Sequence, residues 1–199
     1  MDPQAIFDSI LKWGRGILLD PNPTAAEYAA ANVPWRKTFV ELTIPIALTC
    51  YVIGLALSFL IGGALWRGMF AAAPFYFLVT LIWGLAFVLV AAFVFDYFGA
   101  MVGGVRSFDQ SVAMVSLAMI PSFLGGILSA IPFIGWLISL AATIYAAVLL
   151  YRFVPMFLIV PEIQRVKHFV IALVTCIVIN VLVSGAIAFG MGASVMGAG

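Results

Sequence analysis

Few side chains in this sequence could carry out chemistry, and they are scattered along the chain. There is one histidine, His168, and there are two cysteines, Cys50 and Cys176. A Ser-His-Asp triad would need that single imidazole beside a nucleophile, and a His/Cys zinc site would need both cysteines to converge on it. The sequence contains neither His-Glu-x-x-His nor Gly-x-Ser-x-Gly, and it has no phosphate-binding loop. It therefore predicts no enzyme, no metal site and no cofactor.

The composition indicates which environment holds these residues. Hydrophobic residues make up 65% of the 199 and charged residues only 9%, with a mean hydropathy of +1.23. An ordinary soluble domain is about a quarter charged. The net charge of +1 is too small to indicate a nucleic-acid partner. We expect partners in the membrane: lipids, other integral membrane proteins or a second copy of this chain.

The elements that position these residues are predicted to be membrane-spanning helices. The stretch from Gln110 to Tyr151 carries no charge, and a span needs about 20 mainly apolar residues. Two helices therefore fit, separated by the turn signal Pro132-Phe133-Ile134-Gly135. With three further apolar stretches, the sequence predicts an all-α bundle with spans at about residues 41–64, 74–98, 112–131, 133–154 and 168–191. The remaining segments are an N-terminal amphipathic region, residues 1–40, and a flexible tail, residues 192–199.

The N-terminal region alternates apolar and polar residues at helical spacing. This pattern predicts an amphipathic helix that lies in the headgroup layer or packs on the protein's own surface, and both alternatives stay open. Asp20-Pro21-Asn22-Pro23 should end it. Thr24 and Glu27 have capping-box spacing, which predicts a short helix from Ala25 to about Asn32. Residues expected to contact headgroups are Trp35, Arg36, Lys37, Arg165, Lys167 and His168.

The basic residues predict the orientation of the five spans. With the N-terminus in the cytoplasm, eight of the nine lysines and arginines fall in cytoplasmic segments, and only Arg67 falls outside. The predicted arrangement has a cytoplasmic N-terminus and an external C-terminus.

Four polar side chains are predicted near or within the spans, where an ionisable group is costly without a partner or water. Asp96 and Arg152 lie near cytoplasmic span ends and could form an ion pair, Glu41 lies at a similar depth, and Asn180 lies deep in the fifth span. One hypothesis is a functional polar pocket. The alternative is that the three charged groups are interfacial and Asn180 forms a hydrogen bond between helices.

Small or weakly polar residues recur at spacing four in several spans, a pattern that lets helix backbones approach closely in lipid. The candidate packing residues are Gly54, Ser58 and Gly62 in the first span, and Cys176, Asn180, Ser184 and Ala188 in the fifth.

Several short motifs follow one another along the chain in a specific order. They are Leu18-Leu19-Asp20-Pro21, Thr43-Ile44-Pro45-Ile46, Gly103-Gly104 with Ser107-Phe108, Ile120-Pro121, Ile131-Pro132-Phe133-Ile134-Gly135 and Tyr145. Together they resemble the Yip domain family, named for Ypt/Rab-interacting proteins, over roughly residues 14–183. The resemblance implies five spans and a cytoplasmic N-terminus. Eukaryotic members are linked to vesicle traffic through small GTPases and through pairing with each other.

Two departures from that family argue against small-GTPase binding. The N-terminal region lacks the acidic, proline- and leucine-rich motif of the eukaryotic branch, and Tyr151-Arg152-Phe153-Val154 precedes Pro155 where Gly-Leu is usual. The chain looks more like a bacterial member, and this resemblance implies a location in a bacterial inner membrane.

Two functions remain from the sequence. One is a non-enzymatic membrane scaffold that binds membrane proteins, itself or lipid. The other is a small transporter or channel with a polar path near Asn180, Asp96 and Arg152, in which Pro121 would interrupt the third span.

Overall fold

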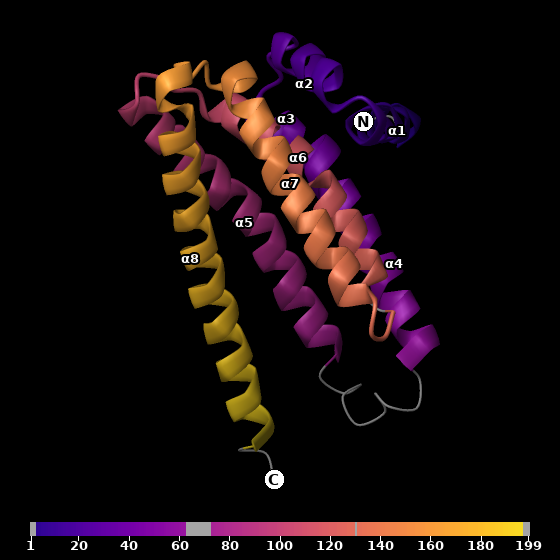
Figure 1. Cartoon of the computed structure of the whole chain (residues 1–199). Helices are drawn as coiled ribbons and strands as arrows, with labels where there is room; N and C mark the ends of the chain where they lie inside the picture. Colours follow the sequence, from indigo (N-terminus) through magenta and orange to yellow (C-terminus); the bar gives the residue numbers. More distant parts are fainter. Residues whose placement is uncertain (1–2, 63–72, 130, 197–199) are drawn as a thin grey trace.

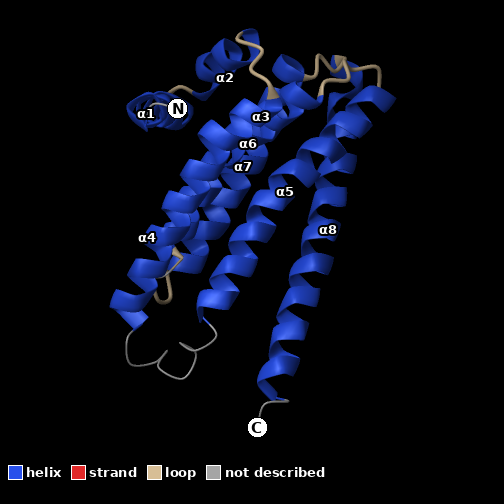
Figure 2. Ribbon diagram, turned by 180° about the vertical axis from the view of Figure 1, so that it is seen from behind, coloured by secondary structure: helices blue, strands red, loops and turns tan. Residues whose placement is uncertain are grey.

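The computed structural model describes residues 3–62, 73–129 and 131–196, and their regular secondary structure is entirely helical (Figure 2). Five helical stretches within these ranges are long and apolar enough to cross a membrane, so the prediction of an all-α protein with five spans is confirmed. The elements are α1 (Pro3–Leu19), α2 (Pro21–Ala30), α3 (Trp35–Thr38), the π-helical turn η1 (Phe39–Thr43), α4 (Ile44–Gly62), α5 (Ala73–Met101), α6 (Phe108–Leu128), α7 (Gly135–Phe157) and α8 (Glu162–Met196).

The long helices run side by side, so that the chain ends lie at opposite ends of the bundle (Figure 1). We call the end that carries α1, α2 and the loops 102–107 and 158–161 the N-terminal end. The turn between α6 and α7 lies at the other end, with the end of α8. Arg67, which the orientation argument placed outside, lies beyond the described residues.

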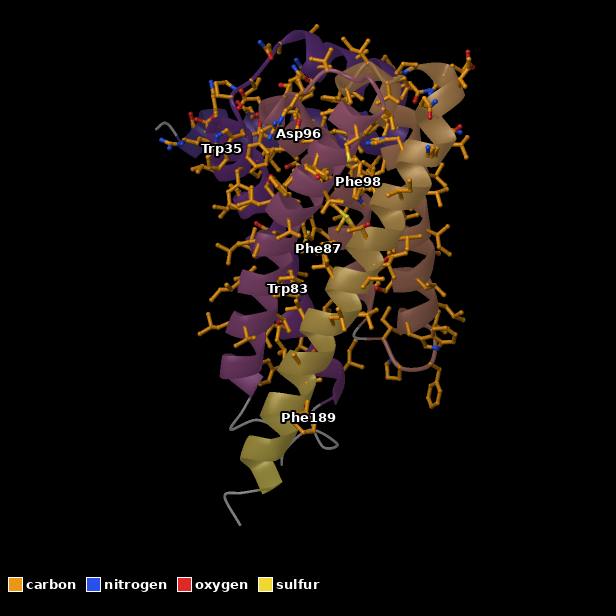
Figure 3. The ribbon with its side chains drawn as sticks, turned by 90° about the vertical axis from the view of Figure 1, so that its left-hand side faces the viewer. Trp35, Trp83, Phe87, Asp96, Phe98 and Phe189 are labelled. Atoms are coloured by element: carbon orange, nitrogen blue, oxygen red, sulfur yellow. The ribbon has the colours of Figure 1, made fainter. Side chains whose placement is uncertain are left out.

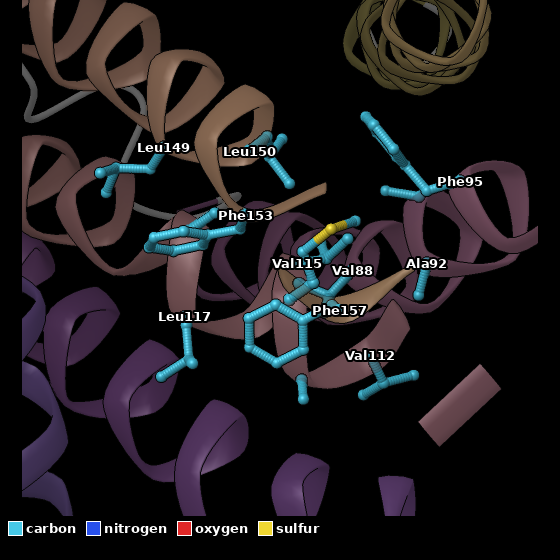
Figure 4. Packing of buried hydrophobic residues seen from close by; sticks show 14 of the residues in the cluster. Val88, Ala92, Phe95, Val112, Val115, Leu117, Leu149, Leu150, Phe153 and Phe157 are labelled. Atoms are coloured by element: carbon cyan, nitrogen blue, oxygen red, sulfur yellow. The ribbon is translucent and has the colours of Figure 1, made fainter. Parts of the chain in front are cut away.

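Helix α6 is the centre of the bundle, and α4, α5 and α7 pack around it. Every residue of α6 from Ser111 to Ala118 is buried. Figure 4 shows side chains of α5, α6 and α7 meeting in one apolar cluster: Val88, Ala92, Phe95, Val112, Val115, Leu117, Leu149, Leu150, Phe153 and Phe157. Because lipid tails are as apolar as these side chains, this core gains from close packing more than from removal of water.

The predicted hairpin of α6 and α7 depends on two glycines. A Cβ at Gly125 would overlap the Cβ of Ala142, so the two helices approach more closely there than any other residue allows. A Cβ at Gly135 would lie 2.5 Å from the carbonyl oxygen of Leu128, across the turn. The hydroxyl groups of Ser122 and Thr143 lie 3.4 Å apart between the same helices.

The second N-terminal helix does not begin with the predicted capping box of Thr24 and Glu27. Helix α2 begins at Pro21, four residues before the expected Ala25, and Thr24 lies inside it. Proline is favoured in a first turn because its missing N–H has no helical partner there. The Thr24 hydroxyl donates to the Asp20 carbonyl, and the Glu27 carboxylate accepts from Lys12 on α1 at 2.7 Å.

The first span starts as a continuous helical run through α3, η1 and α4. The amide of Ile44 donates to the Phe39 carbonyl, five residues back, which is the π-helical pattern. Pro45 has no amide hydrogen, so one hydrogen bond is missing from the backbone ladder of the span, and the wider π-helical turn lies just before this position, while α4 continues past it to Gly62.

Helix α8 is longer than predicted at both ends. It begins at Glu162 rather than near His168, with the Glu162 carboxylate in its first turn, where the helix dipole favours an acid. It also continues through the start of the predicted tail to Met196, and residues 197–199 lie outside the described part. Pro155, expected in a loop, lies inside α7 near its end.

Candidate functional site

Buried polar side chains gather toward the N-terminal end of the bundle. The buried polar residues among those described are Thr38, Thr43, Asp96, Ser111, Ser116 and His168. In Figure 3, Asp96 and Trp35 lie near that end, whereas Trp83 and Phe87 lie further along the bundle, in the apolar middle of α5. The buried polar side chains of the described residues are therefore concentrated at one end of the spans.

Asp96 is held by the loop that follows its own helix. Its Oδ1 accepts the backbone N–H of Ser107 at 2.8 Å, and its Oδ2 lies 3.5 Å from Nε of Arg106. The Ser107 side chain in turn caps α6 by accepting the amide of Gln110. The buried carboxylate thus fixes the loop 102–107 and the start of the central helix.

The structure does not bring Asp96 and Arg152 together as an ion pair. Arg152 is exposed, because α7 turns Leu149, Phe153 and Val154 toward the core and the arginine lies on the opposite face. The partner of Asp96 is Arg106, whose side chain is 70% exposed. Glu41 instead pairs with Lys37 one turn earlier, at 3.9 Å.

His168 was expected to contact headgroups, but the structure buries it completely. Its Nε2 lies 3.0 Å from the carbonyl oxygen of Phe95, and its ring meets the Phe95 ring edge-on. Because α8 begins earlier than predicted, this residue falls one to two turns inside the helix and faces α5. His168 therefore joins α8 to α5.

A second polar group connects the N-terminal helices to the first and third spans. Thr43 of η1 donates to the hydroxyl of Ser116 on α6 at 2.7 Å, and Tyr28 of α2 shares a 2.9 Å hydrogen bond with Thr38. Burial raises the pKa of the Tyr28 hydroxyl, the Thr38 hydrogen bond opposes this rise and the Glu41 charge adds to it. The tyrosine therefore stays neutral and able to donate.

The residues predicted to contact headgroups lie at this same end. Some of them contact other parts of the protein, and others are exposed. The backbone N–H of Trp35 donates to Asp109 at 2.7 Å, and the guanidinium of Arg36 lies over the Trp35 ring. Lys37 and Lys167 are exposed, whereas Arg165 is half-buried.

The small residues of the first span contact α6 only in part. A Cβ at Gly54 would lie 3.5 Å from Cα of Ile127, so the two backbones run close there. Ser58 is exposed and donates to the Gly54 carbonyl of its own helix. Gly62 ends α4, and its surroundings lie outside the described residues.

The small residues of α8 divide into two groups. Ala172 and Cys176 are buried, Asn180 is half-buried, and Ser184 and Ala188 are exposed. The expected hydrogen bond between helices is absent in the described chain, because the Ser184 hydroxyl donates to Oδ1 of Asn180 within α8 at 3.0 Å. The stripe packs inside the molecule over its first half only.

Within the described residues, no group of three or more His, Cys, Asp and Glu side chains lies close enough to hold a metal ion. Cys50 and Cys176 are both buried and free. Sequence reasoning missed Thr38, Thr43, Ser116 and Arg106. Of these, only Thr43 carried a signal, its place two residues before Pro45 in the motif Thr43-Ile44-Pro45-Ile46.

Comparison with known proteins gives a family match for almost the whole chain. The family model of the Yip1 domain matches residues 15–198. No curated protein and no solved structure matches the chain.

Proposed function

The chain belongs to the Yip1 domain family, and from this membership and the geometry of α8 we propose that it is a non-enzymatic membrane scaffold. It binds another membrane protein, or a second copy of itself, through the C-terminal half of α8. The observation that supports this proposal concerns the stripe of small residues at spacing four on α8. The first half of this stripe is buried in the bundle, and its second half is exposed.

The stripe starts inside the bundle. His168, Ala172 and Cys176 follow one another at spacing four, and all three are buried. With 35 residues and a rise of 1.5 Å per residue, α8 is about 52 Å long. Figures 1 and 2 show its far half standing apart from the other helices.

The uncovered half carries polar groups in an apolar setting. Asn180 and Ser184 continue the same stripe, and large apolar residues such as Val181, Leu182 and Phe189 surround them. Small and weakly polar residues on a lipid-exposed stripe favour contact with another helix, because the backbones can approach and the Asn180 amide can donate across the contact. Until a partner is present, the hydrogen bond from the Ser184 hydroxyl to Oδ1 of Asn180 satisfies part of the hydrogen-bonding capacity of these two side chains.

The transporter alternative receives less support from this geometry. Pro121 lies inside α6, which runs unbroken from Phe108 to Leu128, so the third span is not a discontinuous helix. Asp96 is engaged by the loop of its own helix, and Arg152 lies on the outward face of α7.

The test compares two substitutions to leucine on opposite faces of α8. Ser184→Leu places a bulky side chain on the proposed contact, whereas Ala186→Leu places the same side chain on the other, also exposed, face. We expect crosslinking in native membranes, followed by purification, to recover several-fold less partner or dimer with Ser184→Leu than with Ala186→Leu. Asn180→Ala should reduce recovery only mildly, since such hydrogen bonds contribute roughly 0.6 kcal/mol.

Both leucine variants should keep the thermal stability of the parent protein in detergent, because both positions are exposed. Equal crosslink recovery from the two variants would show that this stripe faces lipid, and the scaffold proposal would lose its basis.

A further inference from the structure

Helix α1 crosses the direction of the spans. Figure 1 shows it end-on beside the N-terminal end of the bundle, while α4 to α8 run down the picture. In both Figures 1 and 2, α2 lies nearer the tip of that end and α1 lies on the flank below it. An α-helix at this position runs roughly parallel to a membrane that the spans cross.

One apolar face of α1 packs on the protein. Ile17 is fully buried, and Ile10 and Trp13 pack against the core. The Trp13 ring meets the Tyr28 ring edge-on at 4.8 Å. Of the two alternatives left open by the sequence, packing on the protein's own surface therefore applies to this face of α1.

A second apolar face of α1 is uncovered. It consists of Phe7, Leu11 and Leu18, which are 60%, 53% and 45% exposed. At 3.6 residues per turn, their directions fall within roughly 40° of one another around the helix. They therefore form a single stripe.

The contacts with α2 show which way that stripe points. Lys12 pairs with Glu27, Trp13 meets Tyr28, and a Cβ at Gly16 would lie 2.7 Å from the Thr24 side chain. The directions of these three α1 residues centre roughly 170° from the stripe of Phe7, Leu11 and Leu18. Because α2 lies nearer the tip of the molecule, the stripe points away from the tip, toward the level of the spans.

We propose that this face, Phe7, Leu11 and Leu18, inserts into the headgroup layer of the bilayer that holds the spans. The site is independent of the role proposed for α8. Helix α1 contacts η1, where Val40 is exposed and begins the lipid-facing side of the first span. The α1 face continues that apolar surface sideways, as an interfacial helix does.

The insertion is driven by apolar contact rather than by attraction to anionic lipid. The described residues from α1 to η1 hold four cations, Lys12, Arg15, Arg36 and Lys37, and four acids, Asp8, Asp20, Glu27 and Glu41. Lys12 is also paired with Glu27, and Lys37 with Glu41. A neutral surface of this kind gains little from a negatively charged membrane.

The test measures the depth of single fluorescent labels in the full chain, reconstituted in nanodiscs. The labels are attached to Leu11→Cys and Leu18→Cys in a background that carries Cys50→Ala and Cys176→Ala. Ala26→Cys, on the exposed side of α2, is the matched control. The unlabelled background and parent should show equal thermal stability.

We expect spin-labelled lipid to quench the Leu11 and Leu18 labels several-fold more than the Ala26 label, and aqueous iodide to show the reverse order. Quenching should be the same in phosphatidylcholine and in mixtures that contain phosphatidylglycerol. Iodide quenching of all three labels to the same extent would overturn the insertion. Lipid quenching that arises only with phosphatidylglycerol would overturn the apolar mechanism.

Discussion

At the scale of single residues, the buried polar groups join segments that are distant in sequence. Asp96 holds the loop that begins α6, His168 holds α8 to α5, and Thr43 holds η1 to α6. Water cannot reach these buried groups to form hydrogen bonds, so each side chain bonds to another part of the protein instead. These residues therefore determine how the spans are joined at the N-terminal end.

The first prediction concerns the partner of Asp96. Asp96→Ala leaves the Ser107 amide without its acceptor and should cost about 1–3 kcal/mol of stability. Arg106→Gln should cost less than about 1 kcal/mol, because its side chain is mostly exposed. Thermal unfolding in detergent measures both.

The double variants decide between the two arginines. We expect Asp96→Ala and Arg152→Gln to be additive, and Asp96→Ala and Arg106→Gln to show a small coupling. Coupling of Asp96 with Arg152 alone would restore the ion pair that the sequence suggested.

The second prediction concerns His168. His168→Ala removes the hydrogen bond to the Phe95 carbonyl and the ring contact with Phe95, so it should lower stability by about 1–3 kcal/mol. Lys167→Ala changes the exposed neighbour and serves as the control. If both variants unfold at the same temperature, His168 does not join α8 to α5.

At the scale of the helices, close approach depends on particular glycines rather than on the number of small residues. A Cβ at Gly125 would overlap Ala142, whereas a Cβ at Gly126 would meet nothing within 4 Å. Gly125 therefore has no room for a side chain, whereas its neighbour Gly126 does. The reason is that only Gly125 faces α7.

The third prediction uses this pair. Gly125→Ala should destabilise the α6–α7 hairpin by about 1–3 kcal/mol through overpacking. Gly126→Ala should change stability by less than about 1 kcal/mol, with a gain in helix propensity. Thermal unfolding of the two single variants compares the same chemical change at neighbouring positions, and equal losses would contradict the close contact with Ala142.

At the scale of the whole molecule, α6 is enclosed while the outer faces of the other spans are apolar and uncovered. Exposed residues such as Leu60, Ile82, Trp136 and Leu182 lie on four different helices. In a multi-pass membrane protein these side chains face lipid. The stability of the fold therefore depends on the bilayer as well as on the contacts within the chain.

The fourth prediction concerns orientation. Reporters fused after Lys37, Arg106 and Lys167 should read cytoplasmic, and one after Gly199 should read external. The physical reason is the excess of lysine and arginine at the N-terminal end. A cytoplasmic signal from the C-terminal reporter would contradict five membrane crossings.

The sequence alone was sufficient to predict the number of spans and the hairpin at Pro132–Gly135. These features depend on local properties: apolar length relative to the bilayer, and the helix-breaking chemistry of proline and glycine. The family resemblance was also carried by short motifs, and the family match confirms it.

The partners of the polar side chains were decided by the tertiary structure. Whether Asp96 meets Arg106 or Arg152 depends on which face of α7 packs inward, and His168 is buried because α8 begins at Glu162 and turns that residue toward α5. Likewise, the buried part of the α8 stripe ends at Cys176, because the far half of α8 stands apart from the other helices (Figures 1 and 2). Spacing along the chain determines which residues share a helix face, but contacts between helices determine what that face meets.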